Sequence, residues 1–166
     1  DITLEAYLEK SYYKTASLIA NSAKAAAVLS DVSREIIENL YDYGRYLGLA
    51  FQIVDDILDF TSPTEILGKP SGSDLISGNI TAPALFALEE NPYLEVLIER
   101  EFEQAGDIEK ALNLILESRG IQRSRELAAH YAQLALEHLT CLSPSPSAQA
   151  LADLADYILS LSLIHI

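Results

Sequence analysis

The chain has little cysteine and no long apolar run, and each shortage excludes a class of protein. Among its 166 residues there is one cysteine, Cys141, and no methionine or tryptophan. A single cysteine excludes a disulfide framework within the chain and suits a reducing compartment, so we expect a cytoplasmic protein. No apolar stretch approaches the roughly 18 residues that a membrane span needs.

Basic residues are also scarce. The chain has 11 Lys and Arg against 25 Asp and Glu, a net charge of -14. Such a surface repels nucleic acid and anionic lipid, so we expect no nucleic-acid partner. The composition, 49% hydrophobic and 22% charged, is that of a globular domain with a core. The sequence starts at Asp1 without methionine or a basic targeting stretch, which favours a piece of a longer chain.

Apolar positions recur at helical spacing, and no strand pattern stands out. Thr3 and Ser33 are placed to cap two of the predicted helices, the first of which should be kinked or broken near Ser11. Gly44 and Gly48 lie four residues apart, which predicts a close approach of another helix. The chain is therefore predicted to be all-α, with helices at about 3–29, 34–60, 81–90, 93–104, 107–118, 120–141 and 147–161.

The segment 61–83 differs from the rest because it is rich in glycine, proline, serine and threonine. A loop of this length inside a compact domain is usually functional or disordered. Composition alone would suggest a linker, with one helical turn at 64–67. Because two strongly apolar helices flank it and it contains Lys69 and Asp74, we predict a flap over an active site.

The second predicted helix has a polar stripe. Gln52, Asp55, Asp56 and Asp59 stand at i, i+3, i+4 and i+7, on one face, while their neighbours are apolar as in an interior helix. Desolvated carboxylates repel one another and must either take up protons or bind cations. Asp is a hard oxygen ligand suited to Mg²⁺. The alternative is a solvated acidic face, but acidic residues near a helix C-terminus oppose the macrodipole.

Lys14 and Thr15 are a second candidate site. An ammonium beside a hydroxyl can bind phosphate oxygens, although a lone lysine is more often a surface residue. Lys69 in the segment 61–83 could likewise bind phosphate or be an ordinary surface lysine. Phe51, taken alone, indicates plain core.

Together these stretches resemble a known family. The run from Gly48 to Phe60, GLAFQIVDDILDF, resembles the second aspartate-rich motif of the polyprenyl (trans-isoprenyl) diphosphate synthases. The glycines and Asp74 of segment 61–83 resemble that family's flap, and Tyr7-Leu8 followed by Lys14-Thr15 resembles its lysine-threonine motif. The residues of these motifs are most similar to those of the solanesyl-type enzymes of cyanobacteria and plastids. The similarity covers residues 1–160, as the C-terminal part of the synthase domain, and leaves 161–166 as a tail of another kind.

The resemblance implies an incomplete helical bundle of the isoprenoid synthase type. It implies condensation of isopentenyl diphosphate with an allylic diphosphate, with Mg²⁺ as cofactor. It implies that Asp55, Asp56 and Asp59 bind the metal, Asp55 directly and the other two directly or through water. It further implies a homodimer of the full-length enzyme, loose membrane association through the product, and the plastid stroma for a plant protein. Lys14, Thr15 and Lys69 would hold the allylic diphosphate, and Gln52 and Phe51 would face the reacting prenyl groups.

Two departures limit the resemblance. Asn79 stands where many members of the family have another lysine. The family's first aspartate-rich motif and its isopentenyl diphosphate site are absent. We therefore expect an inactive half of a synthase, with two alternatives: a short non-catalytic subunit that modulates a complete synthase, or a related terpene-type enzyme.

Overall fold

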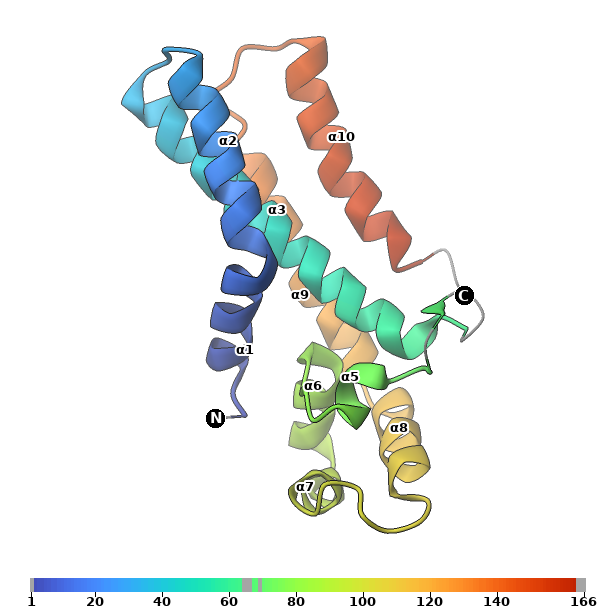
Figure 1. Ribbon diagram of the computed structural model, residues 1–166. Coiled ribbons are helices and arrows are strands. Elements are labelled where there is room, and N and C mark those ends of the chain that lie inside the picture. The colour runs from blue at the N-terminus through green and yellow to red at the C-terminus, as the bar shows by residue number, and fades with distance from the viewer. Residues whose placement is uncertain (1, 64–66, 69, 164–166) are drawn as a thin grey trace.

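The computed structural model describes residues 2–63, 67–68 and 70–163, and every regular element in these ranges is helical (Figure 1). The all-α prediction is therefore confirmed. The elements are α1 (Leu4–Ser11), the π-helical turn η1 (Tyr12–Ala16), α2 (Ser17–Leu29), α3 (Arg34–Thr61), α5 (Ser73–Ile76), α6 (Ala82–Glu90), α7 (Pro92–Glu99), α8 (Asp107–Glu117), α9 (Gly120–Glu137) and α10 (Pro146–Leu161).

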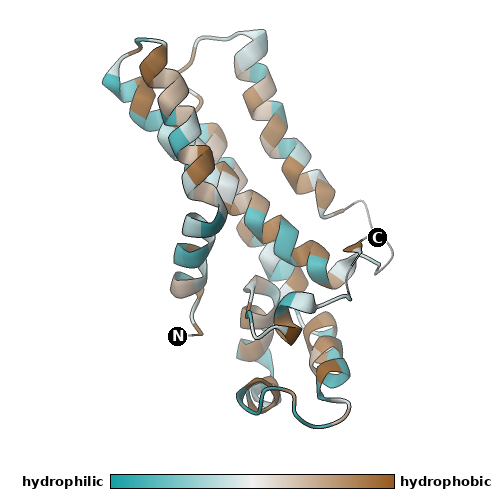
Figure 2. Cartoon of the chain, in the orientation of Figure 1, coloured by the Kyte–Doolittle hydropathy of each residue, from teal (hydrophilic) through white to brown (hydrophobic). Residues whose placement is uncertain are grey.

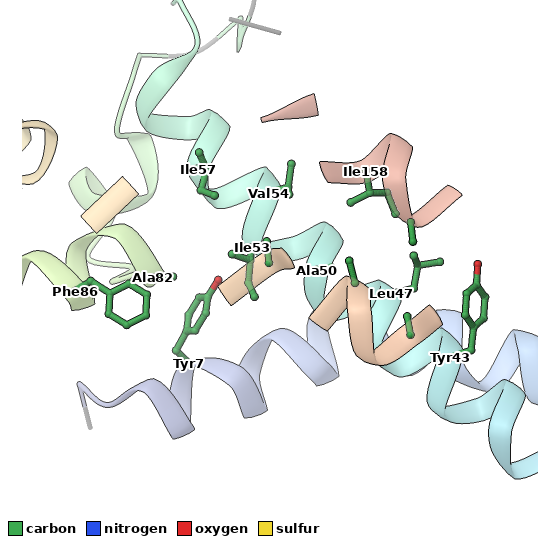
Figure 3. Packing of buried hydrophobic residues seen from close by; sticks show 14 of the residues in the cluster. Tyr7, Tyr43, Leu47, Ala50, Ile53, Val54, Ile57, Ala82, Phe86 and Ile158 are labelled. Atoms are coloured by element: carbon green, nitrogen blue, oxygen red, sulfur yellow. The ribbon is translucent and has the colours of Figure 1, made fainter. Parts of the chain in front are cut away.

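Helix α3 is the central element. It contacts α1, η1, α2, α5, α6, α9 and α10, and its C-terminal half is buried almost all round. Apolar residues spaced along α3, from Tyr43 to Ile57, form the core with Tyr7 of α1, Phe86 of α6 and Ile158 of α10 (Figure 3). A second, smaller core joins α6, α7 and α8 to the end of α3. The predicted interior helix is thus confirmed.

The predicted close approach at Gly44 and Gly48 is also confirmed. A β-carbon on Gly48 would lie 2.5 Å from the Cα of Ala16, and one on Gly44 would lie 2.8 Å from the Cα of Ala20. Real β-carbons do not come this close to backbone atoms. The two glycines therefore let η1 and α2 pack directly against α3. This contact determines how close Lys14 and Thr15 lie to α3.

The helix predicted to be kinked or broken near Ser11 is continuous there, but the π-helical turn η1 follows directly after Ser11. Such turns insert a residue into a helix, and they occur often at functional sites. Here the turn contains Lys14 and Thr15. Thr3 and Ser33 cap α1 and α3 as predicted, each accepting a hydrogen bond from a backbone N–H three residues later.

Two predicted helix ends are wrong. The helix predicted at 93–104 ends at Glu99, because Glu101 and Phe102 have left-handed backbone angles, with φ of 53° and 57°. The helix predicted at 120–141 ends at Glu137. In segment 61–83 the structure adds the short helix α5, whereas the turn predicted at 64–67 falls mostly outside the described residues.

Apolar residues occur along all the long helices, including α10 (Figure 2). Not all of them are buried: Tyr13, Leu18, Val28 and Leu29 of η1 and α2 are exposed. In the part of the chain that the structure describes, no helix combines the length and apolar character needed to cross a membrane.

The glycine contact predicts the effect of Gly48→Ala in the whole protein that contains this chain. In an open helix this change stabilises by roughly 1 kcal/mol. At Gly48 the added methyl group collides with the backbone of Ala16, so we expect destabilisation by about 1–3 kcal/mol instead. Urea denaturation measures the sign directly, and a stabilised variant would contradict the contact.

Candidate functional site

The polar stripe of α3 divides into buried and exposed members. Gln52, Asp56 and Asp59 are 4%, 1% and 2% exposed, whereas Asp55 is exposed. The stripe therefore offers one carboxylate to the outside and keeps two inside the protein. Their partners show what each one does.

Asp56 is held by two donors. The Tyr7 hydroxyl donates to one carboxylate oxygen at 2.5 Å, and the Gln52 side-chain amide donates to the other at 2.9 Å. Tyr7 reaches from α1 toward α3 beside Ile53 (Figure 3). Burial raises the pKa of Asp56 to about 6, although the hydrogen bonds from Tyr7 and Gln52 and the charge of Lys14 oppose the rise. The predicted cost of a desolvated carboxylate is thus present and partly offset.

Gln52 connects Asp56 to the lysine-threonine pair. The Thr15 hydroxyl donates to Oε1 of Gln52 at 2.6 Å, while Nε2 of Gln52 faces Asp56 and, at 3.4 Å, Asp55. Because a carboxylate accepts only, Asp56 fixes which end of the Gln52 amide points at Thr15. The prediction that Thr15 and Gln52 belong to one site agrees with this geometry.

Asp59 has a different role. One of its carboxylate oxygens accepts from the Ser73 hydroxyl at 2.9 Å and the other from the backbone N–H of Asp74 at 3.1 Å. Its backbone carbonyl also accepts from the N–H of Gly72 at 2.8 Å. Asp59 therefore ties the start of α5, within segment 61–83, to the end of α3.

The end of segment 61–83 lies next to the lysines of α1 and η1. Asn79 accepts a hydrogen bond from Nζ of Lys10 at 2.6 Å. Thr81 is 2% exposed, and its hydroxyl oxygen is buried with no hydrogen-bond partner. Both residues line a small cavity that brings the lysines next to the stripe; its lining is Tyr7, Lys10, Ser11, Lys14, Gln52, Asp56, Asn79 and Thr81.

Other predicted site residues lie apart from this cluster. Phe51 is 41% exposed rather than core, one helical turn from Asp55. Lys69 lies outside the described residues. Within the ranges that the structure describes, no three His, Cys, Asp or Glu side chains come close enough together to hold a metal. Asp55, Asp56 and Asp59 share a helix side without forming a closed cage.

Lys10 and Tyr7 were not among the predicted site residues, although Tyr7 belongs to the lysine-threonine motif and both line the cavity. Tyr7, Lys10 and Lys14 stand at i, i+3 and i+7, and this spacing would have placed them on one helical face. The partner of that face, segment 61–83, could not be read from spacing because the segment is irregular.

The sequence of residues 1–115 matches the model of the family described as polyprenyl synthetase. The chain belongs to this family. It is 69% identical over 159 residues to a prenyl transferase of Synechocystis, and 51% identical over 157 residues to the chloroplastic solanesyl-diphosphate synthase 2 of rice. These alignments cover 96% and 95% of the chain but only 49% and 39% of the relatives. The chain thus spans about half or less of the length of the curated relatives it matches.

Solved structures of polyprenyl synthases have the same fold. An apo medium/long-chain prenyl pyrophosphate synthase of Arabidopsis superposes with a TM-score of 0.86 at 44% identity, over 96% of this chain and 55% of that one. A polyprenyl synthase of Caulobacter crescentus, complexed with calcium and isoprenyl diphosphate, gives 0.87 at 36% identity, over 96% and 51%. The predicted helical fold of the isoprenoid synthase type is confirmed.

The buried carboxylate predicts a pH dependence for the stability of this protein. The pKa of Asp56 is about 6 in the folded state, above its ordinary value of 3.8, so the folded protein keeps a proton that the unfolded chain loses. Stability should fall by about 3 kcal/mol as pH rises through this window, and then level off. Asp56→Asn should remove that fall, as urea denaturation of the whole, metal-free protein at about pH 4 and pH 7 would show.

Tyr7→Phe serves as the matched variant. The hydrogen bond from Tyr7 lowers the pKa of Asp56, so its loss should extend the falling region to higher pH. If Asp56→Asn changed the free energy of unfolding equally at both pH values, the raised pKa would be wrong.

Proposed function

We propose that the whole protein containing this chain condenses isopentenyl diphosphate with an allylic diphosphate to give a polyprenyl diphosphate. The observation that supports this most is the junction of Lys14 and Thr15 with Gln52 and the exposed Asp55. This arrangement suits the stabilisation of a leaving diphosphate by cations and hydrogen-bond donors. The allylic carbon–oxygen bond breaks, the isopentenyl double bond attacks the resulting carbocation, and the released diphosphate accepts the proton.

Magnesium is the proposed cofactor. The oxygen donors present fit an ion that is shared between the protein and the substrate. Mg²⁺ is usually held by one or two carboxylates together with substrate phosphates and water, not by a cage of protein ligands. Asp55 is exposed, and among the described residues its one hydrogen bond is the long one from Gln52, so its oxygens can take a metal. When bound, the ion would neutralise charge on the diphosphate.

The other two aspartates are proposed to act on the same metal, but mainly through position. Asp56 already accepts from Tyr7 and Gln52, and Asp59 from Ser73 and the backbone of Asp74. Taking a metal directly would compete with these hydrogen bonds. Contact through water, or orientation of Gln52 and of segment 61–83, requires no such exchange.

The remaining roles are those that the resemblance to the family implies, and for the described residues their positions support them. Lys14 and Thr15 hold the allylic diphosphate, and Lys69 is proposed to do so from segment 61–83. Gln52 is oriented by Asp56, and it faces the reacting groups. Phe51, exposed one turn from Asp55, contacts the prenyl chain.

The residues 1–160 are proposed to form the C-terminal part of the synthase domain, with 161–166 outside it. The complete enzyme is proposed to be a homodimer in the cytoplasm, or in the plastid stroma for a plant source, that meets membranes only loosely through its product. The chloroplastic names of the rice and Arabidopsis relatives support the plastid alternative.

The second candidate function is a short, non-catalytic subunit that binds a complete synthase. The exposed apolar residues of η1 and α2, Tyr13, Leu18, Val28 and Leu29, favour a protein partner of some kind for this face. The rest of the same polypeptide would cover this face equally well. The two functions differ in what the isolated chain does.

The isolated chain of 166 residues is expected to form no product from isopentenyl and allylic diphosphates with Mg²⁺, and to self-associate through its exposed apolar residues. Product analysis and light scattering measure the two properties. Turnover by the chain alone would contradict the proposal that it is half of a site. A monodisperse monomer that stimulates an added complete synthase would favour the subunit function.

Replacing the exposed carboxylate tests the metal role. In the whole enzyme, Asp55→Ala should lower kcat by about a hundredfold or more, because the leaving diphosphate loses its cation. Asp153→Ala, at an exposed carboxylate of α10 bonded to Gln149, is the matched control and should leave kcat unchanged. Near-normal turnover of the Asp55 variant would refute the assignment.

A further inference from the structure

Lys10 is bound to segment 61–83 by a neutral group. Its Nζ donates to Oδ1 of Asn79 at 2.6 Å, across 69 positions of sequence. An ammonium has three N–H donors, and Asn79 takes one of them. Because an amide carries no charge, the contact fixes the position of the lysine and leaves its positive charge in place.

No carboxylate neutralises that charge within the part of the chain that the structure describes. The ion pairs found there involve Lys24, Arg45, Arg100 and Arg123, and none involves Lys10. In the same ranges Lys14 and Lys110 also lack such an ion pair, so Lys10 is distinguished by its short hydrogen bond to Asn79, which fixes where its charge lies.

Asn79 is itself held in place by the stripe of α3. Its backbone N–H donates to the carbonyl of Asp74 at 2.8 Å, and the N–H of Asp74 donates to the carboxylate of Asp59 at 3.1 Å. The position of the Lys10 ammonium is thus determined from Asp59 through Asp74 and Asn79. This chain of contacts leads from one end of the polar stripe back to the helix that precedes Lys14.

Lys10 and Lys14 line the same cavity, together with Gln52 and Asp56. The cavity, about 10 Å³, has room for one water at most, so a diphosphate would lie over its opening. Because Lys10 of α1 and Lys14 of η1 both line this cavity, two ammonium groups are available there for a ligand with two adjacent phosphates.

We propose that Lys10, positioned by Asn79, is a second lysine that binds the diphosphate of the substrate beside Lys14. This inference rests on the proposed function for the identity of the substrate. The chemistry of the ligand, two linked phosphates, is inferred separately from the two lysines that line the cavity. Asn79 is a positioning residue, and Lys10 is the residue that touches the ligand.

The test compares four variants of the whole protein: Lys10→Met, Lys10→Arg, Asn79→Ala, and the double variant Lys10→Met/Asn79→Lys. The first removes the charge, so the KM for the allylic diphosphate and the Ki of inorganic diphosphate should rise about tenfold. Arginine keeps the charge and should stay within about threefold of wild type. Asn79→Ala keeps the charge but frees the lysine, so its effect should be smaller than that of Lys10→Met.

The double variant separates charge from structure. The tips of the two side chains are 2.6 Å apart, so a lysine at position 79 can bring an ammonium to the same region. If charge is what matters, the double variant should recover most of the lost affinity. If the pair only ties segment 61–83 to α1, the double variant should be as poor as Lys10→Met, and Asn79→Ala should equal both, which would overturn the proposal.

Lys24→Met on α2 is the matched control because Lys24 is an exposed lysine paired with Glu38, away from the cavity. It should leave KM and Ki unchanged; a KM for Lys10→Met equal to that of Lys24→Met would also overturn the proposal. If the wild type forms no prenyl product, the proposed function fails, but calorimetric titration of inorganic diphosphate with Mg²⁺ still decides the role of Lys10. Tenfold weaker binding in Lys10→Met supports the role, and equal binding refutes it.

Discussion

The contact between Gly48 of α3 and Ala16 of η1 determines how close the lysine-threonine pair lies to the aspartates. With 2.5 Å between a β-carbon at position 48 and the backbone of Ala16, only glycine permits this packing. The π-helical turn adds a residue at the same place, and this lets Thr15 donate to Gln52 while Lys14 faces Asp56. Backbone packing alone therefore brings two separate motifs together, before any ligand is present.

The three aspartates share a residue type and a helix face, yet their surroundings give them different chemistry. Asp55 lies open to a ligand, Asp56 faces Tyr7 and Gln52 inside the core, and Asp59 faces Ser73 and the backbone of Asp74. Among the described contacts, Asp55 accepts a single long hydrogen bond from Gln52 on one oxygen, whereas both oxygens of Asp56 and of Asp59 accept from protein donors. The stripe thus has one exposed carboxylate and two buried ones, of which Asp56 orients Gln52 and Asp59 holds the start of α5.

Much of this was predictable from the sequence. Helix periodicity gave α3 nearly to the residue, the Thr3 and Ser33 caps gave two helix starts, and the glycine spacing gave the close packing. Residue spacing could not show that Asp55 is exposed and Asp56 buried. Both lie on the same face of α3, and different parts of that face contact α1, contact α5 or lie open to solvent. The ends after Glu99 and Glu137 were missed because no glycine or proline marks them. Tyr7 and Lys10 were missed because their partners are distant in sequence.

The proposed mechanism requires separate roles for Asp55 and Asp56. A crystal structure of the whole protein with Mg²⁺ and an unreactive allylic diphosphate analogue tests this most directly. We expect a carboxylate oxygen of Asp55 to coordinate the metal, while Asp56 keeps its hydrogen bonds to Tyr7 and Gln52. A metal bound directly by Asp56, with those hydrogen bonds broken, or a metal away from Asp55, would contradict it.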